Sequence, residues 1–179
     1  MTAARPRLAP VLVRPVDVAD VPTVVAIQIE AWRAAYAGII PAGYLRAMSA
    51  AEREGRHLDR LRNPAPGASY LVAERDGRIV GMGACGPARD DDLDPATTGE
   101  IYALYADPTA WSTGVGAALM RTCEATLRDA GFSRLTLWVL AGNVRGRTFY
   151  ERRGMRPDGT EQVLDLGAPV LEVRYAADL

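Results

Sequence analysis

Hydrophobic positions follow two different periods along the chain, and each period predicts a different kind of element. In residues 21–36 apolar side chains recur at helical spacing, which predicts a helix with Asp20 as its N-cap. We expect the buried stripe of this helix to consist of Val24, Val25, Ile27 and Ala31. A short apolar run at 11–15 predicts a strand before the helix.

A break separates this helix from a second helical region. Gly38, Pro41 and Gly43 interrupt the periodic pattern, because glycine and proline are poor helix formers. Ser49 and Glu52 then have the spacing of a capping box, in which each side chain accepts a hydrogen bond from the other residue's backbone N–H. The two segments together predict a pair of helices near the N-terminus.

From residue 69 onward the apolar positions take the period of a strand. Asp76 and Gly77 form a dipeptide typical of a two-residue hairpin turn, and they predict a hairpin of strands 69–75 and 78–86. Gly81 and Gly83 within the second strand indicate a bulge or the close approach of another group.

The second half of the chain alternates strands and helices. A strand at 100–106 stops at Pro108, and after it the pattern predicts a helix at 114–130, a strand at 135–140, a helix at 143–153 and a terminal pair of strands. This order predicts an α/β fold of mixed type, with a central six- or seven-stranded sheet flanked on both faces by about four helices. We expect residues 1–179 to form a single domain, because no linker or repeat interrupts the pattern.

Composition and charge exclude several classes of protein. Hydrophobic residues make up 49% and charged residues 24%, which excludes disorder of the whole chain. A formal net charge of −1 argues against nucleic acid as the main partner. Two cysteines and one histidine cannot form a Cys/His zinc site, so we expect no metal. The first ten residues hold two arginines and no apolar run of leader length, and no stretch suits a membrane span, so we expect a cytoplasmic protein without a membrane partner.

A glycine turn provides the first candidate for chemistry. Gly114 and Gly116 lie where a strand passes into a long amphipathic helix, and the unpaired N–H groups at such a junction favour an anion. A tight turn needed only for packing is an equally good interpretation of the glycines alone. No Gly-Lys-Ser/Thr follows them, and Leu119 occupies the third glycine position of a dinucleotide fingerprint, so both of those nucleotide motifs are excluded.

Two motifs together resemble the GNAT superfamily of CoA-dependent N-acetyltransferases. The family signature Gln/Arg-x-x-Gly-x-Gly/Ala aligns with the segment from Trp111 to Gly116, where both glycines match and Trp111 replaces the basic or amide residue. Downstream, a strand is followed by the family's second group of residues, Asn143, Tyr150, Glu151 and Gly154. The similarity spans nearly the whole chain, including the segment from Glu30 to Leu45.

The resemblance implies acetyl-CoA as the cosubstrate and assigns residues to it. Pantetheine and the acyl group would meet the backbone of Leu104, Tyr105 and Ala106. The pyrophosphate would meet the amides of Ser112, Thr113, Gly114, Val115, Gly116 and Ala117, and Asn143 would bond the pantetheine. Trp111 and Ser112 would leave the pyrophosphate contacts to backbone amides.

Acetyl transfer to an amine requires that the amine lose a proton and that the leaving thiolate be stabilised. By position, the resemblance makes Glu100 the candidate base, and alternation along its strand would turn it to the same cleft as Tyr102 and Leu104. A solvent-facing carboxylate is the alternative. Tyr150 is the candidate for hydrogen bonding the thiolate, and a core aromatic is its alternative.

The acceptor is predicted only by chemical class, as a small-molecule or peptide primary amine. Trp32, Tyr36 and Tyr102 are candidates for its pocket, with core packing as the alternative. The acidic loop at 90–94 is expected to be a solvated loop or an attractor of cationic amines, and His57 is expected to be exposed. A group of arginines is expected to form a solvated helix face, with contact to the CoA 3′-phosphate or to a nucleic acid as the alternative, namely Arg145, Arg147, Arg152, Arg153 and Arg156.

The combined prediction is direct transfer of an acetyl group from acetyl-CoA to the amine in a ternary complex. A non-catalytic acyl-CoA-binding or regulatory module is the first alternative, and an RNA-binding adaptor that uses the arginines is the second. The resemblance leaves a homodimer open.

Overall fold

The computed structural model describes residues 8–179. Residues 1–7 lie outside the described residues. The expectation that the first ten residues hold no leader sequence therefore falls mostly outside them. The strands are β1 Leu12–Pro15, β2 Ser69–Arg75, β3 Arg78–Pro87, β4 Thr98–Ala106, β5 Arg134–Leu140, β6 Arg156–Asp165 and β7 Pro169–Asp178. The α-helices are α1 Val21–Ala35, α2 Ala42–Arg46, α3 Ala50–Arg62, α4 Val115–Asp129 and α5 Val144–Glu151. In this part of the chain, no helix is both long enough and apolar enough to cross a membrane.

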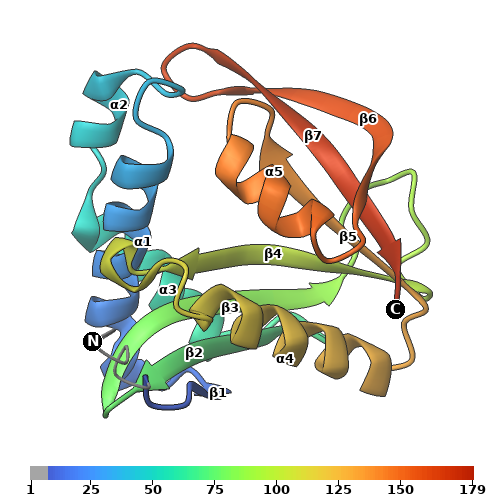
Figure 1. Cartoon of the computed structure of the whole chain (residues 1–179), viewed down its shortest axis with the longest axis horizontal. Coiled ribbons are helices and arrows are strands. Elements are labelled where there is room, and N and C mark those ends of the chain that lie inside the picture. The colour runs from blue at the N-terminus through green and yellow to red at the C-terminus, as the bar shows by residue number, and fades with distance from the viewer. Residues whose placement is uncertain (1–7) are drawn as a thin grey trace, which may run out of the picture.

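All seven strands form one sheet in the order β1-β2-β3-β4-β5-β7-β6 (Figure 1). The pairing of β4 with β5 is parallel, and the other neighbouring strands are antiparallel. The predicted mixed sheet with helices is therefore confirmed, with the larger of the two predicted strand numbers.

Helices cover both faces of the sheet (Figure 1). Helices α4 and α5 share the main hydrophobic core with strands β2 to β5 and β7, where Leu119, Leu137 and Tyr150 meet. Helix α1 packs on the opposite face, where Val24 contacts Val72 and Met82. The short helix α2, inside the predicted break, packs with residues from β5 and the β6–β7 connection.

Two predictions about helix starts have different outcomes. The Ser49 side chain accepts a hydrogen bond from the Glu52 backbone N–H at 3.2 Å, so the Ser49 half of the predicted capping box is confirmed, whereas the Glu52 carboxylate accepts from Arg56. Asp20 occupies the N-cap position of α1, but the predicted capping contact is wrong, because its side chain accepts no hydrogen bond from the backbone of α1. The Asp20 carboxylate instead accepts hydrogen bonds from Arg14, the shorter at 2.6 Å, and from the Asp17 backbone N–H.

The β2–β3 hairpin forms as its sequence predicts. Asp76 and Gly77 have φ of 52° and 71°, the positive values that a type I′ turn requires. At Gly81 an added Cβ would lie 2.8 Å from a Val115 side-chain carbon, because α4 crosses β3 there. The close approach predicted at this glycine is confirmed.

A bulge in β4 changes which side chains face which side of the sheet. Ile101 pairs with Cys85 and Ala103 with Ala84, so Tyr102 is an extra residue on β4. The alternation predicted from Glu100 to Leu104 is therefore broken at Tyr102, although these three residues line one cavity as predicted. Leu104 packs in the α4 core, whereas Ala103 and Tyr105 pack toward α1.

Candidate active site

The site begins where two parallel strands separate. Thr98 to Ile101 of β4 pair with Arg134 to Leu137 of β5, and the pairing ends there although both strands continue. Beyond that point lies a cavity of about 870 Å³. Its walls come from α1, β4, β5, the start of α4, α5, β6 and β7.

The start of α4 presents a glycine turn to this cavity. Gly114 is the N-cap in a left-handed conformation with φ of 97°, and its carbonyl accepts from the Ala118 backbone N–H at 2.9 Å. The backbone N–H groups of the next three residues have no acceptor inside the helix. They lie at the positive end of the helix dipole, which favours an anion.

The preceding loop is fixed by Arg75, whose guanidinium donates to the Thr113 hydroxyl and carbonyl at 2.8 Å each. Of the predicted pyrophosphate residues, Ser112, Gly114, Gly116 and Ala117 line the cavity. Thr113 lies outside the lining, and the Val115 side chain is buried in the core.

A cation stands beside this turn although the chain has Trp111 at the basic position of the motif. The Arg145 guanidinium lies 4.2 Å from the centroid of the Trp111 ring and donates to the Ser112 hydroxyl at 3.1 Å. The Trp111 indole N–H donates to the Ala106 carbonyl at 3.0 Å. Helix α5 thus supplies a positive charge that the local sequence lacks. Several arginines of the predicted solvated face are exposed, Arg145 among them. The interpretation as a solvated face alone is incomplete, because Arg145 also contacts Trp111 and Ser112.

Other members of that arginine group are tied to the protein. Arg147 donates to the Tyr175 hydroxyl at 2.9 Å and to the Ala141 carbonyl at 3.1 Å. The Arg153 guanidinium lies 3.8 Å from the centroid of the Phe149 ring. The Arg147 contacts hold α5 against the sheet, whereas the Arg153 contact lies within the end of α5.

Helix α5 also carries Tyr150 into the cavity lining. Burial raises the pKa of the Tyr150 phenol above its ordinary value, and the neighbouring Tyr105 and Cys123 contribute. The phenol therefore stays protonated and is suited to donate a hydrogen bond. Asn143, at the start of α5, accepts from the Gly146 backbone N–H at 2.9 Å and lines the same cavity.

Glu100 is buried rather than solvent-facing, with 2% of its surface exposed. Its carboxylate accepts from the Arg89 backbone N–H and Nε at 3.1 Å and from Nη2 at 2.5 Å. Arg89 also stacks on Tyr102, 4.1 Å from the ring centroid. Burial raises the pKa of Tyr102 to about 12, and the Tyr102 hydroxyl donates to the Pro87 carbonyl.

The predicted acceptor residues Trp32, Tyr36 and Tyr102 all line the cavity. Trp32 and Tyr36 meet edge to face with ring centroids 5.1 Å apart. Gln162, Leu164 and Glu172 of the last two strands line it as well. Sequence reasoning missed these three, since no local motif marks them.

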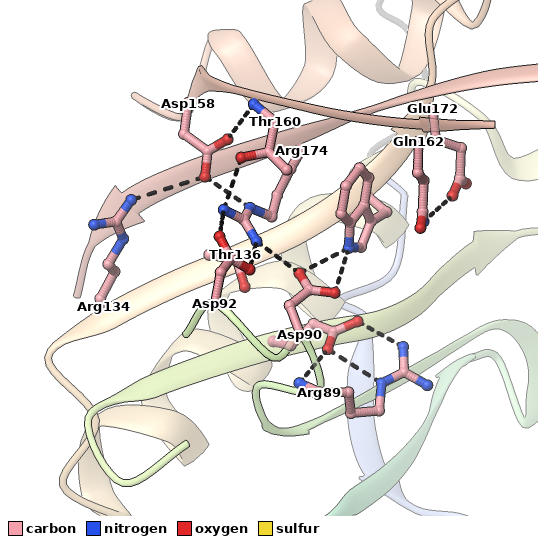
Figure 2. Close-up of polar contacts among 12 residues, drawn as sticks. Arg89, Asp90, Asp92, Arg134, Thr136, Asp158, Thr160, Gln162, Glu172 and Arg174 are labelled. Atoms are coloured by element: carbon pink, nitrogen blue, oxygen red, sulfur yellow. Dashed lines mark hydrogen bonds and ion pairs between the residues drawn. The ribbon is translucent and has the colours of Figure 1, made fainter. Parts of the chain in front are cut away.

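The acidic loop after β3 is tied to the sheet (Figure 2). Arg174, with 3% of its surface exposed, binds Asp90 at 3.0 Å, Asp92 at 2.6 Å and Asp158 at 2.7 Å. The Trp138 indole N–H donates to Asp90. The prediction of a solvated loop is therefore wrong for Asp90, which is half-buried, whereas the Asp92 side chain is 58% exposed although it also pairs with the buried Arg174.

His57 is buried, so the prediction that it is exposed is wrong. Its Nε2 lies 3.2 Å from Gln28 Oε1. Burial lowers the pKa of His57 to about 4, with help from Arg60 and Arg53. Its role is to pack α3 against α1. No group of three or more metal-ligating side chains with suitable geometry occurs within residues 8–179.

The features of the site agree with a family model. Residues 29–155, which include the glycine turn, the strand separation and α5, match the model described as the acetyltransferase (GNAT) family. The chain belongs to this family. It is accordingly an acetyltransferase.

Relatives of the chain include proteins named as N-acetyltransferases. An uncharacterized N-acetyltransferase of Bacillus subtilis, YuaI, is 27% identical over 133 residues, which are 74% of this chain and 73% of the relative. An uncharacterized N-acetyltransferase of Mycobacterium tuberculosis is 39% identical over 103 residues, or 58% of this chain and 62% of the relative. The second match thus spans less than two thirds of that relative.

A solved structure has the same fold. The PaiA N-acetyltransferase of Thermoplasma acidophilum, crystallised in complex with coenzyme A, superimposes with a TM-score of 0.73 at 19% identity. The match covers 95% of this chain and 99% of that one.

Proposed function

We propose that the chain transfers an acetyl group from acetyl-CoA to a primary amine by direct attack in a ternary complex. The observation that carries the proposal is the cavity at the β4–β5 separation, which has the glycine turn of α4 at one end and Trp32 and Tyr36 at another wall. The coenzyme A bound by the PaiA structure supports the choice of cosubstrate.

Each end of the cavity suits one part of acetyl-CoA. The free amides of α4 and the Arg145 guanidinium favour the pyrophosphate. At Leu104, Tyr105 and Ala106, β4 pairs with β3 on one edge and has no strand partner on its β5 edge, which offers hydrogen bonds to the pantetheine amides. Asn143 lines the same cavity. This places the thioester toward Tyr150, whose protonated hydroxyl donates to the thiolate as it leaves.

Coenzyme A binding and transfer are tested together. Calorimetry with acetyl-CoA should detect binding at one site per chain. A thiol-release assay with acetyl-CoA and a panel of amines, from dipeptides to diamines and amino sugars, should find release above the amine-free rate. Binding without release for every amine would contradict the transfer and favour a non-catalytic module. The absence of binding would contradict the proposal as a whole.

Tyr150→Phe should lower kcat roughly 10- to 100-fold while the Kd of acetyl-CoA stays within about twofold, since a hydrogen bond to a charged group contributes about 1.5–3 kcal/mol. The phenyl ring keeps the packing against Phe149 and removes only the hydroxyl. Thiol release measures kcat, and calorimetry measures Kd. Tyr70→Phe, on β2 and outside the cavity, is the matched control. An unchanged kcat in Tyr150→Phe would refute the role in thiolate stabilisation.

A further inference from the structure

Glu172 on β7 is a carboxylate of the cavity to which neither sequence motif points. It pairs across the sheet with Leu140 of β5 on one side and Gln162 of β6 on the other. The Gln162 side-chain amide donates to Glu172 Oε2 at 3.0 Å, as Figure 2 shows. Both side chains line the cavity, and Glu172 is half-buried there.

The two carboxylates of the cavity lining differ in their partners. Glu100 is neutralised by Arg89 at 2.5 Å. Glu172 forms no ion pair with any cation of residues 8–179, and its bond from Gln162 is neutral. Arg174 lies two positions along β7, but its guanidinium is bound to Asp90, Asp92 and Asp158. Glu172 therefore retains an oxygen and a negative charge for a ligand.

The surroundings of Glu172 include aromatic side chains and a second carboxylate. Burial raises the pKa of Glu172 above its ordinary value, the bond from Gln162 opposes this, and the charge of Glu100 adds to it. Tyr36 of α1 and Tyr105 of β4 line the same cavity, where burial raises their pKa values and the charge of Glu172 adds to this. The Arg53 guanidinium of α3 lies over the Trp32 ring, 5.1 Å from its centroid, and forms no ion pair with Glu172.

We propose that Glu172 receives the acceptor amine, accepting hydrogen bonds from its ammonium form and then its proton. The acceptor is accordingly a primary amine that arrives as a cation, with its carbon chain beside Trp32 and Tyr36, which line the same cavity. This inference rests on the proposed function and names the substrate class of the same cavity.

Atoms and charge are conserved in the proposed transfer. One N–H proton of the ammonium passes to the Glu172 carboxylate, and the lone pair of the neutral amine nitrogen then attacks the thioester carbonyl carbon. The C–N bond forms and the C–S bond breaks, and the thiolate leaves as a hydrogen-bond acceptor of Tyr150. The amide nitrogen loses its second proton to the thiolate, which departs as coenzyme A thiol, and Glu172 returns its proton to solvent.

Binding can be tested without knowledge of the natural acceptor. Protein labelled with ¹³C at glutamate carboxyls is saturated with coenzyme A, and the Glu172 signal is identified by its loss in Glu172→Gln. Propylammonium chloride should shift this signal, whereas 1-propanol and sodium chloride at equal concentration should not. The same Glu172 shift with all three additives, or no shift with propylammonium, would overturn the inference.

Kinetics test the proton transfer. With any amine that the wild-type enzyme acetylates, Glu172→Gln should lower kcat/KM about 100-fold or more, the usual range for loss of a general base. The wild-type kcat/KM should fall as the pH falls through the raised pKa of Glu172, and this acid limb should vanish in the variant. Glu161→Gln, exposed on β6 and outside the cavity, is the control.

The two proposals fail in different ways. If Glu172→Gln binds acetyl-CoA with wild-type affinity and keeps both the rate and the acid limb, only the inference about Glu172 is wrong. If the wild-type protein does not bind acetyl-CoA by calorimetry, the proposed function itself is wrong.

Discussion

Gly116→Trp should weaken acetyl-CoA binding at least about 100-fold, equivalent to roughly 3 kcal/mol. Gly116 lies in the first turn of α4, on the cavity, and an added Cβ would already approach two Phe149 ring atoms at 3.3 Å. An indole there would fill the space that we propose for the pyrophosphate, beside the amides of the first turn of α4. Because the backbone of Gly116 is helical, the substitution leaves the fold of α4 possible.

Calorimetry with acetyl-CoA measures the effect, and circular dichroism checks that the variant is folded. Gly55→Trp is the matched control, because Gly55 is an exposed helical glycine with nothing within 4 Å of an added Cβ. Equal affinity of Gly116→Trp and the wild-type protein would show that the cosubstrate binds elsewhere.

Arg174→Met should lower the free energy of unfolding by about 3–5 kcal/mol, because it leaves partly buried carboxylates without their cation. Arg174 joins β7 to the loop after β3 through Asp90 and Asp92 and to β6 through Asp158 (Figure 2). Methionine keeps most of the side-chain volume, so loss of charge and hydrogen bonds dominates the change. Urea unfolding followed by fluorescence measures it.

Arg134→Met is the control for this variant. Arg134 lies 3.9 Å from the same Asp158, but its side chain is 46% exposed, so the expected loss is below about 1 kcal/mol. Equal destabilisation by the two variants would contradict the importance of the buried arginine.

The difference in unfolding free energy between the wild-type protein and Arg174→Met should depend on pH. The bond from Arg174 holds the pKa of Asp92 below its ordinary value. Burial of Asp158 acts to raise its pKa, but the bonds from Thr160 and Arg174 outweigh burial, so that pKa is also lowered. Stability from such groups is complete above the unfolded pKa of about 3.9 and is lost as the pH falls through the folded values. The difference between wild type and Arg174→Met should therefore shrink below about pH 4.

The sequence by itself determined the elements whose signals are local. The helical period predicted α1 and α4, because one apolar stripe every 3.6 residues suffices to bury a helix face. Asp76 and Gly77 predicted the hairpin turn, because both positions need positive φ. The glycine turn and Tyr150 were placed by motif spacing, and the structure brings both to one cavity.

Tertiary structure decided the features that depend on pairing between distant segments. The extra residue Tyr102 in β4 can be located only from the register against β3, and it turns Leu104 away from the α1 side. Arg145 replaces the cation that the Trp111 position lacks only because α5 packs beside the start of α4.

Glu172 enters the cavity only because β7 lies between β5 and β6 in the sheet. Strand order and register follow from the packing of all seven strands together, so no pattern along β7 could place this carboxylate. The sequence alone thus determined the local elements and the glycine turn, while the sheet order decided which side chains of β6 and β7 line the cavity.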